Sequence, residues 1–247
     1  MILVVDLGNS RVKWGVCEHR TLDDCGGLSY GAGSLRRDLS YAWARLEQPA
    51  MVMFCAVAPE SMVGEFEDCV SSRWNMTPVR LAASREAHGV RCAYRNPHQF
   101  GADRWAALVA ARHMAPNGAV VVDCGTTTTV DAVDHTGQHL GGVIVPGVSL
   151  MRQSLAEGTG RIGRVGDGMI DLRTRDTSGA VATGTVIAVS STVDRIVGEY
   201  QSRLGDDART LITGGEADLV MSRSNTAFEK WPDLVLRGLW IAAERAA

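Results

Sequence analysis

One short pattern occurs twice in this chain and constrains its fold more than any other feature. Residues 4–16 read VVDLGNSRVKWGV, and residues 121–133 read VVDCGTTTTVDAV. Each copy is an apolar run that ends in an Asp, followed by one residue, a Gly and a cluster of small hydroxyl or amide side chains. Such a run is typical of a buried strand that enters a hairpin, since Gly and Asn tolerate positive φ. The repeat therefore predicts two halves that begin with the same hairpin.

The segments that follow each hairpin keep a similar order. The first half continues with a helical apolar spacing over 35–48, an apolar strand at 50–58 and a helix from Pro59 toward Trp74. A polar, irregular stretch at 85–100 then leads into a helix at 105–114. The second half restarts with strands and returns to helices: strands at 119–125, 128–134 and 139–147, helices at 148–157 and 177–205, a strand, glycine turn and helix at 208–220, and a helix at 232–244.

This alternation predicts an α/β fold of two domains. The tripeptide Pro116-Asn117-Gly118 separates the two hairpin-led halves, so we expect domains at 1–116 and 117–247. Two matching hairpins would supply donors from both sides of a cleft. That arrangement suits a phosphate chain or a metal ion.

The charge balance favours a small ligand. Lys and Arg number 25 against 28 Asp and Glu, with no run of like charges, so neither nucleic acid nor a membrane surface is an expected partner. Lys13 and Lys230 are the only lysines, which excludes a Walker-type loop ending in Gly-Lys-Ser or Gly-Lys-Thr.

The cysteines indicate a cytoplasmic protein with reduced thiols. The six are scattered without a C-x-x-C pair, so a zinc site is not expected. The apolar start MILVV ends at Asp6 after five residues, too short for a signal peptide or a membrane span.

The first hairpin has the chemistry of a phosphate-binding loop. Gly8 lets backbone N–H groups approach phosphate oxygens, Asn9 and Ser10 add side-chain donors, and Asp6 can reach a cation or its water shell. The alternative is a turn needed for folding alone. The repeat argues against it, because two unrelated turns rarely share the placement of the Asp.

The second hairpin offers Asp123 and Thr126 as candidates. Thr128 and Thr129 follow them, and we interpret these two as structural because Thr is a good strand former. The later turn ITGGEAD, residues 212–218, can lay backbone against a flat adenine or ribose, or it can simply pack a helix start closely.

Two other patterns are rejected as sites. EGTGRIG, residues 157–163, matches G-x-G-x-x-G but follows a helix rather than a strand, so a flexible loop is expected. His135 and His139 flank a turn at Gly137 with no third ligand nearby, and we expect both to be solvent-exposed.

The stretch NPHQFGADRW, residues 96–105, carries the clearest catalytic candidates. Asp103 and Arg104 lie at an expected helix start, where the helix dipole favours a carboxylate. Asp103 can take the proton of an acceptor hydroxyl, and Arg104 can hold an anionic group. The alternative is that Asp103 only caps the helix.

Five motifs in order resemble the type III pantothenate kinases over nearly the whole chain: DLGNSRVKWG, YRNPHQFGADRW, VVVDCGTTTTVDAV, GGVIVPGVSLMRQSL and LITGGEAD. The resemblance implies the acetate and sugar kinase/actin superfamily, with two ribonuclease-H-like domains around a central nucleotide cleft. It implies ATP-dependent phosphorylation of pantothenate in coenzyme A synthesis, with Mg²⁺, a monovalent cation (K⁺ or NH₄⁺) and a homodimer.

The resemblance also assigns roles to residues of this chain. Asp103 corresponds to the proton acceptor, and Asp123 to the monovalent-cation position. The ATP contacts correspond to Asp6, Leu7, Gly8, Asn9, Ser10, Arg11, Val12, Lys13 and Thr126, and the substrate contacts to Tyr94, Gly101, Ala102, Asp103, Arg104 and Thr177.

Two positions depart from the family pattern. Asp176 stands before Thr177 where the family has Asn, and Thr127 stands where it has a small Ala or Ser. A kinase for another small alcohol is disfavoured by the short chain and the GADR loop. A non-catalytic ATP-binding regulatory protein is disfavoured because Asp6, Asp103 and Asp123 are all present.

Overall fold

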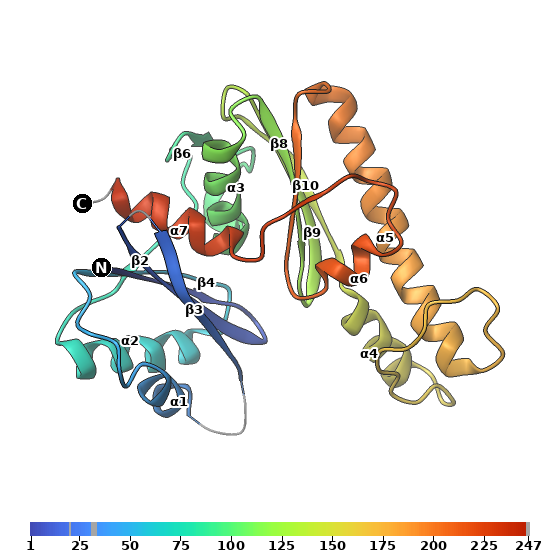
Figure 1. Cartoon of the computed structure of the whole chain (residues 1–247), viewed down its shortest axis with the longest axis horizontal. Helices are drawn as coiled ribbons and strands as arrows, with labels where there is room; N and C mark the ends of the chain where they lie inside the picture. Colours follow the sequence, from blue (N-terminus) through green and yellow to red (C-terminus); the bar gives the residue numbers. More distant parts are fainter. Residues whose placement is uncertain (20, 31–33, 246–247) are drawn as a thin grey trace. The chain divides into compact units, whose positions relative to one another are not determined.

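The computed structural model describes residues 1–19, 21–30 and 34–245 (Figure 1). The chain divides into two compact units: unit 1 consists of Met1–Met114 and Asp233–Ala247, and unit 2 of Ala115–Pro232. The expected division at 116/117 put residues 233–247 in the second half, and the structure differs there. The reason is packing, because α7 (Leu234–Glu244) lies against α3 (Ala102–Met114) and β1 (Ile2–Leu7) of unit 1.

Unit 1 contains a five-stranded sheet in the order β3-β2-β1-β4-β5. β1 is antiparallel to β2 and parallel to β4. The strands are β1 (Ile2–Leu7), β2 (Arg11–Glu18), β3 (Thr21–Ser29), β4 (Met51–Ala56) and β5 (Val79–Arg80), and the helices between them are α1 (Leu35–Ala42) and α2 (Glu60–Trp74).

Unit 2 repeats this topology in its sheet order β10-β9-β8-β11-β12. The predicted duplication is therefore confirmed, and so is the ribonuclease-H-like α/β fold class. The strands are β8 (Gly118–Cys124), β9 (Thr127–Asp134), β10 (His139–Pro146), β11 (Arg209–Thr213) and β12 (Glu229–Lys230), and the helices are α4 (Val148–Gly158), α5 (Thr177–Leu204) and α6 (Ala217–Met221).

The alternation of β1 and β4 decides which side chains belong to the core and which to the site. Leu3, Val5 and Leu7 of β1 face a core cluster with α1 and α2, together with Val52, Phe54 and Ala56 of β4. Asp6 and Cys55 therefore lie on the opposite face, which α3 and α7 cover. This places Asp6 on the same side of the sheet as the helix that carries Asp103.

The two cores have different compositions. In unit 1, Trp43 makes an edge contact with Trp14 at 5.9 Å between ring centroids and stacks on Trp74 at 5.7 Å. In unit 2, the valines of α5 pack against β8 and β9. Much of the small-residue stretch 178–197 therefore faces the core of its own unit.

Helix α5 is long and apolar enough to cross a membrane, with a mean hydropathy of 1.3 over its best window. Half of that window is buried inside the structure. A core helix of a soluble protein has the same composition, and the packing of α5 on the sheet accounts for it.

The sequence pattern did not predict some of the elements. β3 is an edge strand with exposed and polar positions. The ring of Trp14 packs against Gly26 of this strand and leaves no room for a Cβ there. The stretch expected to be irregular contains a short hairpin, β6 (Glu86–Ala87) with β7 (Val90–Arg91), and the 3₁₀ turn Pro97–Gln99.

The packing of α7 on α3 yields a stability prediction. A Cβ on Gly238 would overlap the carbonyl group of Ala106, so Gly238→Ala should lower the free energy of unfolding by about 3 kcal/mol through overpacking. Gly64→Ala in α2 is the matched control, because no atom lies within 4 Å of its Cβ position. That variant should gain about 0.5–1 kcal/mol from helix propensity. Denaturant unfolding of both variants checks this, and equal effects would contradict the close packing.

Candidate active site

Asp6 is the second-to-last residue of β1 and is almost fully buried, with 8% of its surface exposed. Its parallel neighbour is Cys55, whose Sγ donates a hydrogen bond to Asp6 Oδ1 at 3.6 Å. Lys13 lies directly opposite Asp6 on the antiparallel strand β2. Asp6 is thus held between a thiol on one side and a facing cationic residue on the other.

The turn of the first hairpin is pinned at its base and open at its tip. The Gly8 N–H donates to the Arg11 carbonyl at 3.0 Å, and the Tyr30 N–H donates to the Ser10 carbonyl at 3.2 Å. Asn9 and Ser10 are exposed. Such a turn can present donors to an anion without first having to become ordered.

Leu7 and Val12 have a structural part in the predicted ATP loop. They pair with each other across the hairpin and are fully buried. Four residues separate them, whereas three separate the corresponding pair Cys124 and Thr128 in unit 2. The two hairpins are therefore similar but not identical.

Asp103 lies in the first turn of α3, after the glycine of the substrate loop. Its Oδ1 accepts a hydrogen bond from the Arg104 N–H at 2.7 Å. A Cβ on Gly101 would be 2.6 Å from that oxygen, so the glycine makes room for the carboxylate. The capping interpretation accounts for this one oxygen of Asp103.

Arg104 is buried and fixed by two aromatic rings. Its Nη1 donates to the Tyr94 hydroxyl at 3.1 Å, and its guanidinium lies 4.5 Å from the centre of the Phe100 ring. Tyr94 and Phe100 also contact each other, with 4.9 Å between their ring centroids. The structure thus brings together the predicted Tyr94 and Arg104. It adds Phe100, for which the only signal was an aromatic residue directly before GADR.

Cys55 of β4 lies beside Asp6 and faces the same side of the unit 1 sheet. Burial raises the pKa of the Cys55 thiol well above its usual value, and the carboxylates of Asp6 and Asp103 raise it further. Both carboxylates therefore act on one buried thiol. Because α3 covers that face of the sheet, the predicted phosphate loop and the predicted base lie on the same side of it.

In unit 2, Asp123 is the second-to-last residue of β8 and lies beside its parallel neighbour Thr213. Gly214 follows at φ +97°, and a Cβ there would overlap the Cys124 carbonyl group. No atom lies within 4 Å of a Cβ on Gly215. Of the paired glycines, the first serves close packing and the second leaves open space.

The threonine cluster divides as the sequence indicated. Thr126 and Thr127 are exposed at the turn, whereas Thr128 and Thr129 are buried in β9. Thr127 pairs with Pro146 at the end of β10. Its departure from the family pattern therefore places an exposed hydroxyl group beside Thr126.

Thr177 begins α5 and is separate from the hairpin contacts of unit 2. Asp176 caps this helix by accepting the Gly179 N–H at 2.7 Å, which an Asp can do as well as the usual Asn. Thr177 is exposed and lines an apolar cavity of 640 Å³ with Met151 and Leu155 of α4.

The patterns rejected as sites have mixed outcomes. Residues 159–176 contain no helix or strand, which agrees with a loop rather than a dinucleotide fingerprint. The prediction that His139 is solvent-exposed is wrong. It is buried, and its Nε2 lies 3.0 Å from Asp131 Oδ1, because its side chain enters the sheet at the start of β10. His135 is exposed as expected.

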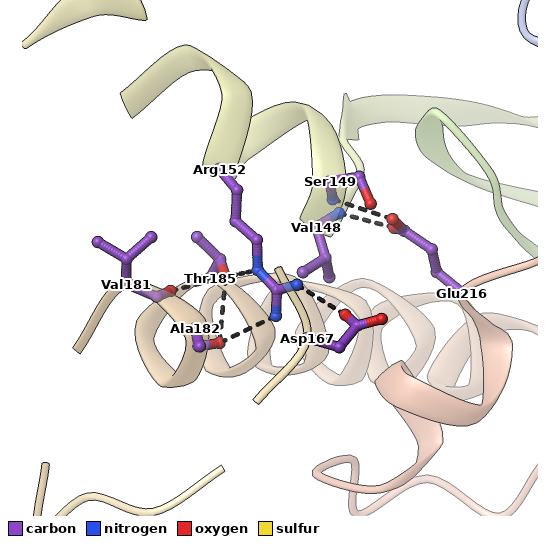
Figure 2. Close-up of polar contacts among 8 residues, drawn as sticks. All are labelled: Val148, Ser149, Arg152, Asp167, Val181, Ala182, Thr185 and Glu216. Carbon is purple, nitrogen blue, oxygen red and sulfur yellow. Dashed lines mark hydrogen bonds and ion pairs between the residues drawn. The ribbon is translucent and has the colours of Figure 1, made fainter. Parts of the chain in front are cut away.

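Sequence reasoning missed two polar anchors of α4 that Figure 2 shows. Arg152 is buried, and its Nη1 donates to Asp167 Oδ1 at 2.8 Å, which ties the 159–176 segment to the helix. Glu216 binds the first turn of the same helix. In both interactions the partners are more than ten residues apart in sequence, so no local pattern predicts them.

Among the described residues, no group of three or more His, Cys, Asp or Glu side chains could hold a metal ion. The carboxylates at the two strand ends, Asp6 and Asp123, are the positions where a cation could bind together with a ligand that supplies oxygens.

Comparison with known proteins gives consistent results. A family model for type III pantothenate kinase matches residues 2–199. The type III pantothenate kinase of Halorhodospira halophila is 36% identical over 244 residues, covering 97% of this chain and 96% of its own. That of Nitrosococcus oceani is 33% identical over 245 residues, with 97% and 92% covered. MreB5 of Spiroplasma citri bound to AMPPNP, a solved structure, has a TM-score of 0.54 at 12% identity, covering 99% of this chain and 96% of its own, and shows the fold alone.

The burial of Cys55 predicts the thiol chemistry of the native protein. Cys25 is exposed and the other five cysteines are buried. Burial raises the pKa of Cys17 to about 12 and the pKa values of Cys55 and Cys124 well above their usual range. A bulky disulfide reagent at pH about 9 should therefore react quickly with Cys25 alone, since the thiolate is the nucleophile. Cys25→Ser should abolish the fast phase, and a fast phase that remains would contradict the burial of the other five cysteines.

Proposed function

The chain belongs to the type III pantothenate kinase family, and we propose that it transfers the γ-phosphoryl group of ATP to the primary hydroxyl group of pantothenate. The product is 4′-phosphopantothenate, and the reaction is the first step of coenzyme A biosynthesis. The observation that carries the proposal is that Asp6, near the end of β1, and Asp103, in the first turn of α3, lie on the same side of the sheet of unit 1. A phosphate-binding hairpin next to a base at a helix start is what an ATP-dependent alcohol kinase needs.

The nucleotide phosphates would bind along the first hairpin, from Asp6 to Lys13. The tip residues Asn9 and Ser10 are exposed on a turn whose base is already closed by hydrogen bonds. Little conformational freedom is therefore lost on binding. Lys13 adds a positive charge opposite Asp6. Thr126 would make the second ATP contact from unit 2, through its exposed position in the turn.

A kinase of this fold uses ATP with a divalent metal, and we propose Mg²⁺. Mg²⁺ keeps several waters and takes one or two carboxylates together with the phosphates, which fits the single carboxylate of Asp6 better than a closed cage. When bound, it neutralises charge on the transferring phosphoryl group. K⁺ or NH₄⁺ would bind at Asp123, where the neighbouring backbone carbonyls and Thr side chains are oxygen ligands.

The acceptor would bind at Gly101, Ala102, Asp103, Arg104 and Tyr94, with Thr177 as a further contact. Asp103 takes the proton of the pantothenate hydroxyl group. The hydroxyl oxygen of pantothenate bonds to the γ-phosphorus, and the bond between the γ-phosphorus and the bridging oxygen breaks, so that ADP leaves with that oxygen. Arg104, stacked on Phe100 and bonded to Tyr94, has a fixed guanidinium that suits an anionic group of the substrate.

We further propose a homodimer in the cytoplasm. The apolar cavity lined by Met151, Leu155 and Ala188 beside Thr177 is the part of unit 2 that would gain from being covered. Size measurement in solution tests the dimer.

The direct test is ATP-dependent formation of 4′-phosphopantothenate by the purified protein with Mg²⁺, with K⁺ present or replaced by Na⁺. Turnover on pantothenate, with none on a panel of other small alcohols, supports the proposal. Turnover on another alcohol would identify a different kinase. ATP binding without turnover on any acceptor would indicate a regulatory protein.

Asp103→Asn should lower kcat by about 10²- to 10⁴-fold, because the amide cannot accept the hydroxyl proton. The affinity for an ATP analogue should stay unchanged, since the side-chain oxygen that contacts the Arg104 N–H is retained. Asp38→Asn is the control, an exposed carboxylate of α1 paired with Arg37. Steady-state kinetics and analogue binding measure both effects, and an unchanged kcat would remove Asp103 from the mechanism.

Asp123→Asn should weaken activation by K⁺ more than it weakens folding. The amide keeps the size of the side chain and one oxygen but removes the charge that attracts a monovalent cation. The measurement is the K⁺ concentration for half-maximal turnover, together with the thermal unfolding midpoint. An unchanged K⁺ dependence would argue against a cation at Asp123.

A further inference from the structure

Glu216 supplies the cap of a helix that lies far from it in sequence (Figure 2). Its Oε2 accepts the Val148 N–H at 2.7 Å, and its Oε1 accepts the Ser149 N–H at 2.9 Å. The residue at the N-cap position of α4 is Gly147, which has no side chain for this purpose. One carboxylate therefore satisfies two of the first N–H groups of the helix.

The backbone of Glu216 holds the other side of the same site. Its N–H donates to the Cys124 carbonyl at 2.9 Å, at the start of the second hairpin turn. The Gly147 N–H donates to the Thr126 carbonyl at 3.1 Å, at the end of that turn. Glu216 thus links both ends of the turn: directly through its main chain at Cys124, and through the capped helix at Thr126.

The start of α4 and the glycine turn after β11 both pack closely against the second hairpin turn. A Cβ on Gly147 would be 2.8 Å from the Thr126 carbonyl oxygen and 2.9 Å from Glu216 Oε2. A Cβ on Gly214 would likewise overlap the Cys124 carbonyl group. A shift of the α4 start is therefore transmitted to the turn, because backbone touches backbone at both points.

Glu216 also determines how the positive end of α4 is used. A helix N-terminus attracts anions through its dipole and its open N–H groups. Here the carboxylate of the chain itself occupies the first two of these groups. These two N–H groups are therefore not available to an incoming phosphate.

We propose that Glu216 is a positioning residue of the kinase site. It fixes the Gly125–Thr126 turn by capping α4, so that Thr126 is already in place when ATP binds. This role rests on the proposed function, in which Thr126 contacts ATP. Glu216 itself does not take part in the transfer.

Glu216→Ala and Glu216→Gln test this role in the full-length protein. With Ala, both the Kd of a non-hydrolysable ATP analogue with Mg²⁺ and the KM for ATP should rise about tenfold, because residues of one hydrogen-bond network are coupled. Gln keeps one acceptor oxygen and the side-chain volume, so its effect should be smaller. Asp218→Asn in α6, an exposed carboxylate paired with Lys230, is the matched control and should match the wild type.

A double-mutant cycle separates positioning from a general loss of structure. In a Thr126→Ala background, Glu216→Ala should raise the Kd of the analogue by less than about twofold, since Thr126 is the residue through which Glu216 acts. An unchanged affinity in both Glu216 variants would overturn the proposal. So would a full tenfold loss in the Thr126→Ala background.

Stability and analogue binding are measured separately. Thermal unfolding is recorded for each variant, and binding is measured at a temperature at which all of them are folded. If Glu216→Ala fails to fold, the comparison rests on Glu216→Gln, and an analogue affinity equal to wild type in that variant overturns the proposal. Because analogue binding needs no pantothenate, failure of the wild type to phosphorylate pantothenate overturns the proposed function without deciding the role of Glu216.

Discussion

Each unit depends on one parallel strand pairing, β1 with β4 in unit 1 and β8 with β11 in unit 2. Parallel neighbours end at the same edge of a sheet, so the Asp near the end of the first strand of each unit has a partner on the adjacent strand. Asp6 lies beside Cys55, and Asp123 beside Thr213. The burial of apolar side chains that drives this pairing thus also places the polar groups.

The two hairpins place different side chains opposite their Asp because their turns differ by one residue. The longer turn of unit 1 brings Lys13 opposite Asp6, whereas the shorter turn of unit 2 brings Thr129 opposite Asp123. A strand position that shifts by one residue exchanges the side chains on the two faces. The hairpin of unit 1 consequently combines a carboxylate with a cation, which suits phosphates, and that of unit 2 combines a carboxylate with hydroxyl groups, which suits a small cation.

Local patterns predicted those parts of the fold and the site that local interactions determine. The hairpins, α5 and the start of α3 at Asp103 follow from periodicity and turn residues alone. The long-range parts had no such signal. The packing of α7 on α3 assigns the last helix to unit 1, and the pairing with Asp131 buries His139. Glu216 reads as an ordinary turn residue until α4, 68 positions earlier, is placed against it.

The paired glycines after β11 differ in what the fold requires of them. A flat ligand ring and close packing were alternatives for the whole turn. The structure separates them by residue, because Gly214 contacts the hairpin backbone while Gly215 faces open space. A side chain at position 214 would displace the turn from Cys124, and with it the backbone of Glu216. A side chain at position 215 would meet no neighbouring atom, so close packing requires the first glycine and not the second.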